Sequence, residues 1–451
     1  MKRIVLSNEG ARYSVHVGAI LIGLVFIGAF GYISRIYFYH TIMLYVYGLF
    51  AVLLCTYFFK LHDRLSLPWP VVPIAAYMIW TSAVHDLSRS KDYLILFLTC
   101  TLILTIRLSM RSMEKLFKCI SVAGTIFSLS IIWQRITPGI YYKFYRLIAT
   151  SMSLERAKAY VASERAFTGF VGESAWACLC VATAISCTFV SLFFYKSSKR
   201  NLSLKIFMLG IMYVSIILTN RRAFILSVPA VLGAIWIYFM LRDKENKKKL
   251  IALAIIMLGL VMMYFVFLPI IMKILTQGGK GIQLSKREIY WDLAFKIFRK
   301  DPLFGQGPRS FDFYYIAMTQ RDLQFAGAHN CYIQMLAEFG IVGTVMYVFF
   351  IVFMGVKSLR IAVTCLRENK TEIGFFAFTA LVMQAFYVMM ALSESAFFLP
   401  QALIMYFMFI NVIQNCSVMS DKAERRKSHS LDELIFYPRV RSFLGRFRIT
   451  R

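Results

Sequence analysis

The segment 285–343 carries charged residues, glycine turns and a histidine together, in a chain that otherwise consists mostly of apolar runs. Its histidine, His329, stands just before an apolar run. At a helix start the dipole favours the neutral imidazole, which can then accept a proton near neutral pH. His329 is therefore a candidate general base. The alternative is a polar residue with a purely structural role at a membrane boundary.

Basic residues precede the histidine at a predicted helix start. Ser285 and Glu288 form a capping-box pattern, so the helix should begin there and place Lys286 and Arg287 in its first turn. Unpaired backbone N–H groups in a first turn attract phosphate groups, although an ordinary surface helix would show the same pattern. Lys286 and Arg287 are thus candidate phosphate-binding residues.

A glycine turn follows this helix and ends at Arg309. Its sequence is Gly-Gln-Gly-Pro-Arg over residues 305–309, and glycine allows the backbone to approach a ligand or simply to reverse direction. Arg309 and Asn330, which follows the histidine, are candidate substrate-positioning residues.

Two adjacent arginines, Arg221 and Arg222, occupy a very short connection between apolar runs. Charges so close to hydrocarbon are costly unless they are solvated or paired with an anion. The planar guanidinium group binds phosphate oxygens in pairs and stays charged. Both arginines are therefore candidate anion ligands, and contact with lipid phosphates is the competing explanation.

An acidic residue, Glu173, ends the segment 135–173 at the start of another apolar run. The carboxylate either favours the helix dipole or orients a substrate hydroxyl. Earlier in this segment the aromatic and basic residues of 141–146 suggest a location in the lipid headgroup layer.

The composition shows what must hold these residues in place. The chain has 451 residues, of which 59% are hydrophobic and 16% charged, and its mean hydropathy is +0.64. The apolar runs have the length that a bilayer requires of a helix, about 17 to 25 residues. We predict an all-α polytopic membrane protein. The twelve predicted spans are 16–34, 40–59, 68–84, 93–107, 115–134, 174–194, 203–219, 223–241, 250–272, 331–356, 372–392 and 396–416.

Charge predicts the orientation of a single transmembrane domain, 1–416. With a cytoplasmic N-terminus, roughly 31 of the 51 Lys and Arg residues fall on the cytoplasmic side, as the positive-inside rule demands. This rule, rather than nucleic-acid binding, accounts for much of the net charge of +28. The basic tail 417–451 should then be cytoplasmic, as a lipid contact or a topology anchor. Lys2 and Arg3 precede an apolar run long enough to remain as the first span, so no cleavable signal peptide is expected.

The remaining basic residues concentrate in three outer segments: the loops 135–173 and 273–330, and the pair Arg221 and Arg222. We expect these segments to form a shared extracytoplasmic pocket for an anion such as a diphosphate. The nine cysteines lie mostly in apolar runs, without the spacing of a disulfide framework or a zinc site. Acidic pairs typical of a metal-dependent transferase are also not evident in the outer loops.

Several of these segments together resemble the bacterial O-antigen ligase and O-antigen polymerase superfamily. His329-Asn330, followed after nine residues by Gly-Ile-Val-Gly at 340–343, is similar to its histidine motif. The helix that starts with Arg287, the turns 302–307 and 219–222, and the segment 169–174 are similar to other signatures in the expected order. The resemblance covers about residues 160 to 350. Members usually carry a single arginine in the short turn; we assign that role to Arg222, with Arg221 as the alternative.

The resemblance implies an enzyme of the bacterial inner membrane that transfers glycan on its extracytoplasmic side, without nucleotide sugar, cofactor or metal. The donor would be a glycan on undecaprenyl diphosphate. Arg222 or Arg221, with Arg287 and Lys286, would bind the diphosphate, and His329 would activate the acceptor. Glu173, Asn330 and Arg309 would position the substrate. Further expected partners are membrane lipids and a chain-length regulator protein.

Two members of the superfamily share this chemistry but differ in acceptor. A polymerase joins lipid-linked repeat units, whereas a ligase transfers finished glycan to lipid A-core, and the segment 169–174 is more similar to polymerases. A polysaccharide flippase is the alternative of another class. The long outer loop, the scarcity of charge within spans and the lack of a clear internal repeat argue against transport.

Overall fold

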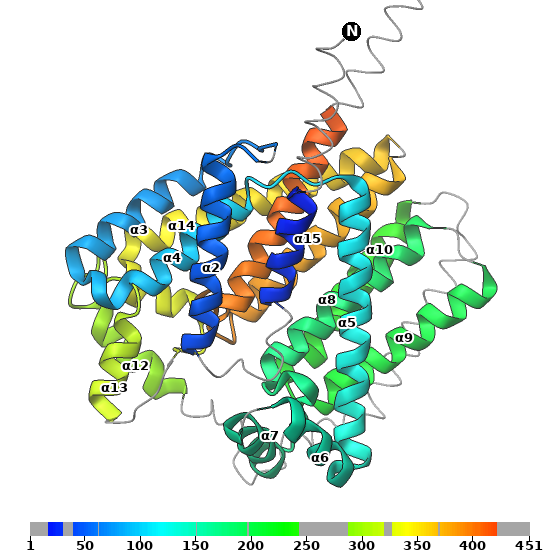
Figure 1. The fold of residues 1–451 in the computed structure, drawn as a ribbon, viewed down its shortest axis with the longest axis horizontal. Helices are drawn as coiled ribbons and strands as arrows, with labels where there is room; N and C mark the ends of the chain where they lie inside the picture. The colour runs from blue at the N-terminus through cyan, green and yellow to red at the C-terminus, as the bar shows by residue number, and fades with distance from the viewer. Residues whose placement is uncertain are drawn as a thin grey trace, which may run out of the picture.

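The computed structural model describes residues 17–29, 39–61, 63–149, 151–195, 198–242, 287–319, 327–368 and 370–421 (Figure 1). Regular structure in these ranges is helical, apart from one isolated bridge between Arg64 and Ile106. The predicted all-α class is therefore confirmed for the described part of the chain.

Helices occupy eleven of the twelve predicted spans, and the remaining one, 250–272, lies outside the described residues. Six described helices are long and apolar enough to cross a membrane. They are α5 (Met110–Ile136), α8 (Ser174–Phe194), α9 (Lys199–Leu218), α14 (Cys331–Arg367), α15 (Thr371–Ala391) and the helix Pro400–Asp421. The total of twelve spans stays a prediction.

The other described helices are not in this set of six. They are the helix Val17–Ala29, α2 (Tyr39–Phe58), α3 (Val71–His85), α4 (Leu87–Ile103), α6 (Pro138–Ile148), α7 (Ser151–Glu164), α10 (Arg222–Arg242), α12 (Arg287–Phe298), α13 (Ser310–Thr319), and the short 3-10 helices η1 (Gly169–Val171) and η2 (Ala396–Phe398).

The centre of the helical assembly is α8, which packs against α5, α9 and α15 (Figure 1). Its sequence is rich in Ala, Ser and Cys, and small residues let neighbouring helices approach closely. Gly124 of α5 shows this directly, since a Cβ there would lie 2.1 Å from the Cβ of Ala184 on α8. The buried cysteines of α8 thus act as small packing residues, as expected.

The helix ends alternate between two ends of the molecule. At one end the start of α8, the end of α9, the start of α14 and the end of α15 are joined: Phe167 N donates to Leu218 O at 3.0 Å, and Asn330 Nδ2 to Leu392 O at 3.2 Å. We call this the site end. At the opposite end Lys370 Nζ, just before α15, donates to Ser420 Oγ at 2.9 Å, near the end of the helix Pro400–Asp421. This separation agrees with the predicted two sides, while the cytoplasmic orientation stays a prediction.

The long helix α14 is broken at Gly340, where the backbone has φ 60° and ψ −168°. A break frees backbone groups that must find partners away from water. The loop 302–307 supplies them: Ile341 N donates to Pro302 O at 2.9 Å, and Gly307 N to Glu338 O at 2.9 Å. The glycine turn thus approaches α14 itself.

We expect Gly340→Ala to destabilise the protein by at least about 2 kcal/mol, because the left-handed conformation disfavours alanine. A new Cβ would also lie 2.4 Å from Leu303 O. Gly355→Ala is the matched control, since it lies on the same helix and its Cβ would meet no atom within 4 Å. Thermal unfolding in detergent should give a clearly lower Tm for Gly340→Ala. Equal Tm values for both variants would contradict this role of the break.

Candidate functional site

Three candidate residues from distant segments converge on one carboxylate, that of Glu394. His329 Nδ1 lies 3.0 Å from its Oε2. Arg221 Nη1 lies 3.5 Å and Arg287 Nη2 3.9 Å from its Oε1. The Glu394 side chain is only 14% exposed. We refer to Glu394, His329, Arg221, Arg287 and Glu173 together as the Glu394 cluster.

The turn between α15 and the helix Pro400–Asp421 holds Glu394 in place. The Cys331 thiol donates a hydrogen bond to the Glu394 carbonyl oxygen at 3.2 Å and accepts one from Phe397 N at 3.2 Å. The backbone N–H of His329 donates to Ser395 Oγ at 3.2 Å. The turn is thereby bound to the start of α14 through both backbone and side chains.

The backbone of His329 adopts a left-handed conformation, with φ 52°. Such a conformation costs energy in a non-glycine residue and often occurs at functional sites. The next residue, Asn330, caps α14 by accepting hydrogen bonds from Tyr332 N at 3.0 Å and Ile333 N at 3.1 Å. Asn330 therefore fixes the helix start beside His329, and its predicted contact with substrate stays a prediction.

The pairing with Glu394 sets the chemistry of the His329 ring. A neutral imidazole carries one proton, and the carboxylate at Nδ1 favours that proton on Nδ1. Nε2 is then an acceptor, and the side chain is 43% exposed, so a substrate hydroxyl can reach it. This arrangement suits a general base.

Arg221 occupies the turn between α9 and α10 and contacts two acids. Its Nε donates to Ser174 Oγ at 2.6 Å, and its Nη2 lies 3.6 Å from Glu173 Oε1. Its side chain is 23% exposed. The sequence resemblance favours Arg222 for the diphosphate, whereas the structure places the alternative, Arg221, in the Glu394 cluster. Arg222 is the first residue of α10, and its side chain lies outside the described residues.

Glu173 is the N-cap of α8, where its carboxylate accepts hydrogen bonds from Ala175 N and Trp176 N. This geometry confirms its predicted place at the helix start. Because the same carboxylate also contacts Arg221, Glu173 helps to orient the guanidinium group.

Arg287 is the first residue of α12, in agreement with the predicted helix start. The helix is held beside α14 by Trp291, whose Nε1 donates to Ala328 O at 3.1 Å. The neighbouring candidate Lys286 lies outside the described residues.

Arg309 is not brought into the Glu394 cluster. Its Nη2 lies 2.8 Å from Asp312 Oδ2 and its Nη1 3.5 Å from Asp92 Oδ2. Its backbone N–H donates to Glu338 Oε2 at 2.7 Å. These contacts join the loop after α12 to α4, α13 and α14. Arg309 therefore holds these elements together and does not contact the Glu394 cluster.

Two aromatic residues of α6 pack inside the protein, and the location of 141–146 in the headgroup layer stays a prediction. Tyr141 and Tyr145 are fully buried, and Tyr141 stacks on Phe170 with ring centroids 5.9 Å apart. On the opposite face of this short helix the apolar residues Ile140 and Leu147 are exposed. The tyrosines thus support the turn that carries Glu173.

Burial and charge act in opposite directions on Glu394. Burial alone would raise the pKa of its carboxyl group, but the hydrogen bond from His329 and the charges of Arg221 and Arg287 outweigh this effect. The pKa of Glu394 is therefore lower than its ordinary value, and the carboxylate is an anion at neutral pH.

Glu394 is not among the candidate residues predicted from the sequence. The predicted spans 372–392 and 396–416 leave only a very short connection that contains it. An acidic residue in such a connection, on the side where the basic outer segments gather, was the available signal.

Replacing Glu394 should lower the free energy of unfolding and make that free energy depend less on pH. With a folded pKa below 4.5, the carboxylate stabilises the folded state above about pH 4.5, and this contribution is lost as the pH falls through the lower folded value. Glu394→Gln should cost about 1–3 kcal/mol at neutral pH, because it weakens the pairing of buried charged groups.

Thermal unfolding from neutral to acidic pH checks this effect. The Tm of the wild-type protein should fall more steeply with acidification than that of Glu394→Gln. Glu288→Gln, an exposed change on α12, is the control and should follow the wild-type slope. Parallel curves for all three proteins would refute the role given to Glu394.

Comparison with known proteins gives one family match. Residues 206–348 match the family model described as O-antigen ligase. A comparison with curated proteins found no match. The matched range contains Arg221, Arg287 and His329, whereas Glu173 and Glu394 lie outside it. The match supports glycosyl transfer of the polymerase or ligase type, and it confirms the resemblance of the chain to the O-antigen polymerase and ligase superfamily.

Proposed function

We propose that this protein polymerises repeat units of a surface polysaccharide, with undecaprenyl-diphosphate-linked glycan as donor, on the extracytoplasmic side of the bacterial inner membrane. The observation that carries this proposal is the convergence of Arg221, Arg287 and His329 on Glu394. The cluster combines two permanent cations with a carboxylate–imidazole pair, as transfer from a diphosphate requires.

In this reaction the protein must stabilise the leaving group and accept a proton from the acceptor hydroxyl. An acceptor hydroxyl oxygen bonds to the anomeric carbon of the donor, and the bond from that carbon to the phosphate oxygen breaks with its electron pair on the diphosphate. Fixed cations stabilise the charge that develops on this leaving group. The hydroxyl proton passes to His329 Nε2, while Glu394 stabilises the resulting imidazolium.

The distances within the Glu394 cluster indicate which of its contacts a bound diphosphate could replace. The His329–Glu394 contact, at 3.0 Å, has the length of a good hydrogen bond. The Arg221 and Arg287 contacts to Glu394, at 3.5 and 3.9 Å, are longer and weaker. A diphosphate binds guanidinium groups in paired, charge-assisted hydrogen bonds at about 2.8 Å. We expect it to replace the two long contacts and leave the carboxylate–imidazole pair intact.

A ligase is the second candidate function, because the matching family model is described as O-antigen ligase. The donor side would be the same, and the acceptor would be lipid A-core in place of a lipid-linked repeat unit. A flippase is less well supported, since movement of a lipid gives no role to a general base.

Reconstitution in liposomes tests this proposal, with undecaprenyl-diphosphate-linked repeat units as the sole substrate and gel analysis of the products. We expect a ladder of longer glycans. His329→Ala should reduce the rate by about 10²-fold or more through loss of the base. Arg287→Ala should reduce it by about 10²- to 10³-fold through loss of leaving-group stabilisation.

Lys296→Ala is the matched control on α12, because Lys296 is 65% exposed and pairs with Asp292 away from the cluster. It should retain wild-type activity. Product formed only after addition of lipid A-core would identify a ligase. Lipid movement without new glycosidic bonds would identify a flippase, and wild-type rates in both cluster variants would refute the residue roles.

The same assay should distinguish the roles of the two adjacent arginines. Arg221→Ala removes a group that contacts Glu394 and Glu173, so we expect a loss of about 10²-fold or more. Arg222→Ala should cost less than Arg221→Ala. Expression and Tm of both variants serve as controls for folding. If Arg222→Ala lost more activity than Arg221→Ala, the diphosphate-binding role would belong to Arg222.

A further inference from the structure

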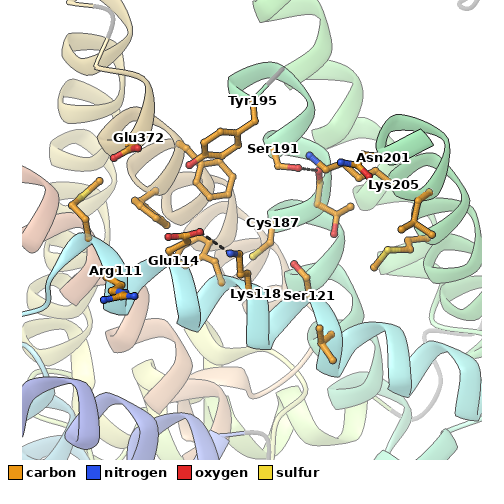
Figure 2. A pocket seen from close by; sticks show the side chains of 18 residues that line it. Arg111, Glu114, Lys118, Ser121, Cys187, Ser191, Tyr195, Asn201, Lys205 and Glu372 are labelled. Atoms are coloured by element: carbon orange, nitrogen blue, oxygen red, sulfur yellow. Dashed lines mark hydrogen bonds and ion pairs between the residues drawn. The ribbon is translucent and has the colours of Figure 1, made fainter. Parts of the chain in front are cut away.

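Glu338 is a carboxylate inside α14 that the glycosyl-transfer chemistry proposed above does not use. It is fully buried, although α14 is one of the helices apolar enough to cross a membrane. By contrast, Glu114 and Lys118 of α5, which line the cleft shown in Figure 2, have side chains that are 53% and 73% exposed. An ionisable residue buried in such a helix is costly, which makes Glu338 a candidate for a functional role.

Each oxygen of the Glu338 carboxylate accepts one hydrogen bond. Gln334 Nε2, one turn earlier on the same helix, donates to Oε1 at 3.0 Å. The backbone N–H of Arg309 donates to Oε2 at 2.7 Å, and the carbonyl oxygen of Glu338 accepts from Gly307 N at 2.9 Å. Glu338 therefore holds the glycine turn 305–309 against α14 through both its side chain and its backbone.

Gln334 continues this network towards the histidine. Its side chain is buried, and while Nε2 donates to Glu338, Oε1 accepts from the backbone N–H of Ala328 at 3.1 Å. The carbonyl oxygen of Ala328 accepts from Trp291 Nε1 of α12 at 3.1 Å. Both polar backbone atoms of the residue that precedes His329 are thus held, one by α14 and the other by α12.

The fixed backbone of Ala328 determines how His329 is presented. With φ 52°, His329 has a conformation that costs energy in a non-glycine residue and persists only where its surroundings impose it. On one side of His329 the chain is fixed by Asn330, the N-cap of α14. On the other side it is fixed at Ala328 by Gln334. These two constraints hold the ring where its Nδ1 meets Glu394.

We propose that Gln334 and Glu338 are positioning residues for the transfer reaction. The pair fixes Ala328 relative to the glycine turn 305–309 and thereby holds the His329 imidazole in the position of a general base. Both side chains act through the backbone of Ala328 and not on the reacting atoms. This inference rests on the proposed function, in which His329 accepts the proton of the acceptor hydroxyl.

The pattern of donors and acceptors makes the pair testable. The backbone N–H groups of Ala328 and Arg309 face its two ends, so the pair must supply an acceptor at each end and a hydrogen bond between its own members. One amide and one carboxylate satisfy this requirement. Two amides would leave one donor facing another donor, and two carboxylates would leave one acceptor facing another acceptor.

Exchange of the two side chains therefore separates this pattern from the identity of each residue. Glu338→Gln and Gln334→Glu each break the pattern, whereas the double variant with both changes restores it. In the liposome assay we expect each single variant to lower kcat by about tenfold or more, because a buried group loses its partner and the positioned state of His329 is less populated. KM should change little, and the double variant should regain most of the wild-type kcat.

Nitrogen-15 NMR of the full chain in nanodiscs, labelled at histidine, follows the His329 ring without any substrate. The signals of His329 are assigned by difference from His329→Gln. The wild-type protein and the double variant should carry the ring proton on Nδ1, and the single variants should show a mixture of the two tautomers. If the wild-type protein transferred no glycan, the proposed function would fail, and these ring signals would still test the positioning.

Ser358→Ala is the matched control. Near the other end of α14, Ser358 Oγ accepts from Gln384 Nε2 at 2.7 Å, so this change also removes a buried hydrogen bond from the same helix. It should lower the Tm but leave kcat and the His329 ring signals unchanged. Equally large changes of the ring signals in Ser358→Ala would overturn the proposal. So would wild-type ring signals in Glu338→Gln, or a double variant that regained the wild-type Tm without the wild-type ring signals.

Discussion

The carboxylate of Glu394 is the interaction on which the site end depends. A carboxylate so deeply buried is costly unless several positive or hydrogen-bonding groups compensate it. Those groups come from the α9–α10 turn, the start of α12 and His329, which lies two residues before α14. One anion therefore assembles three segments that are far apart in the sequence. It also leaves the two arginines in the long contacts that we expect the proposed diphosphate to replace.

The break in α14 is the constraint that makes this assembly geometrically possible. At Gly340 the helix changes direction, and the loop 302–307 pairs with the backbone groups that the break leaves free. This loop continues directly from α12, which begins with Arg287. The same set of hydrogen bonds thus orients the short helical segment behind His329 and anchors the helix that carries Arg287. The spacing from His329 to Gly340 thus places the break of α14 where the loop 302–307 packs against it.

Much of this arrangement could be predicted from the sequence, because apolar run length and charge clustering are local signals. They located the helices, and they singled out Arg287, His329 and Glu173 in separate outer segments. Long-range partners are not encoded locally. The pairing of Arg309 with Asp92, the central place of Glu394 and the inward packing of Tyr141 each depend on contacts between residues far apart in the chain. The contact of Arg221 with Glu394 likewise joins residues far apart in the chain.

A structure of the protein in nanodiscs with undecaprenyl diphosphate bound would test the central claim most directly. We expect phosphate oxygens within about 3 Å of the guanidinium groups of both Arg221 and Arg287. We also expect the contact between His329 and Glu394 to persist. A diphosphate bound elsewhere, with both arginines still directed at Glu394, would contradict it.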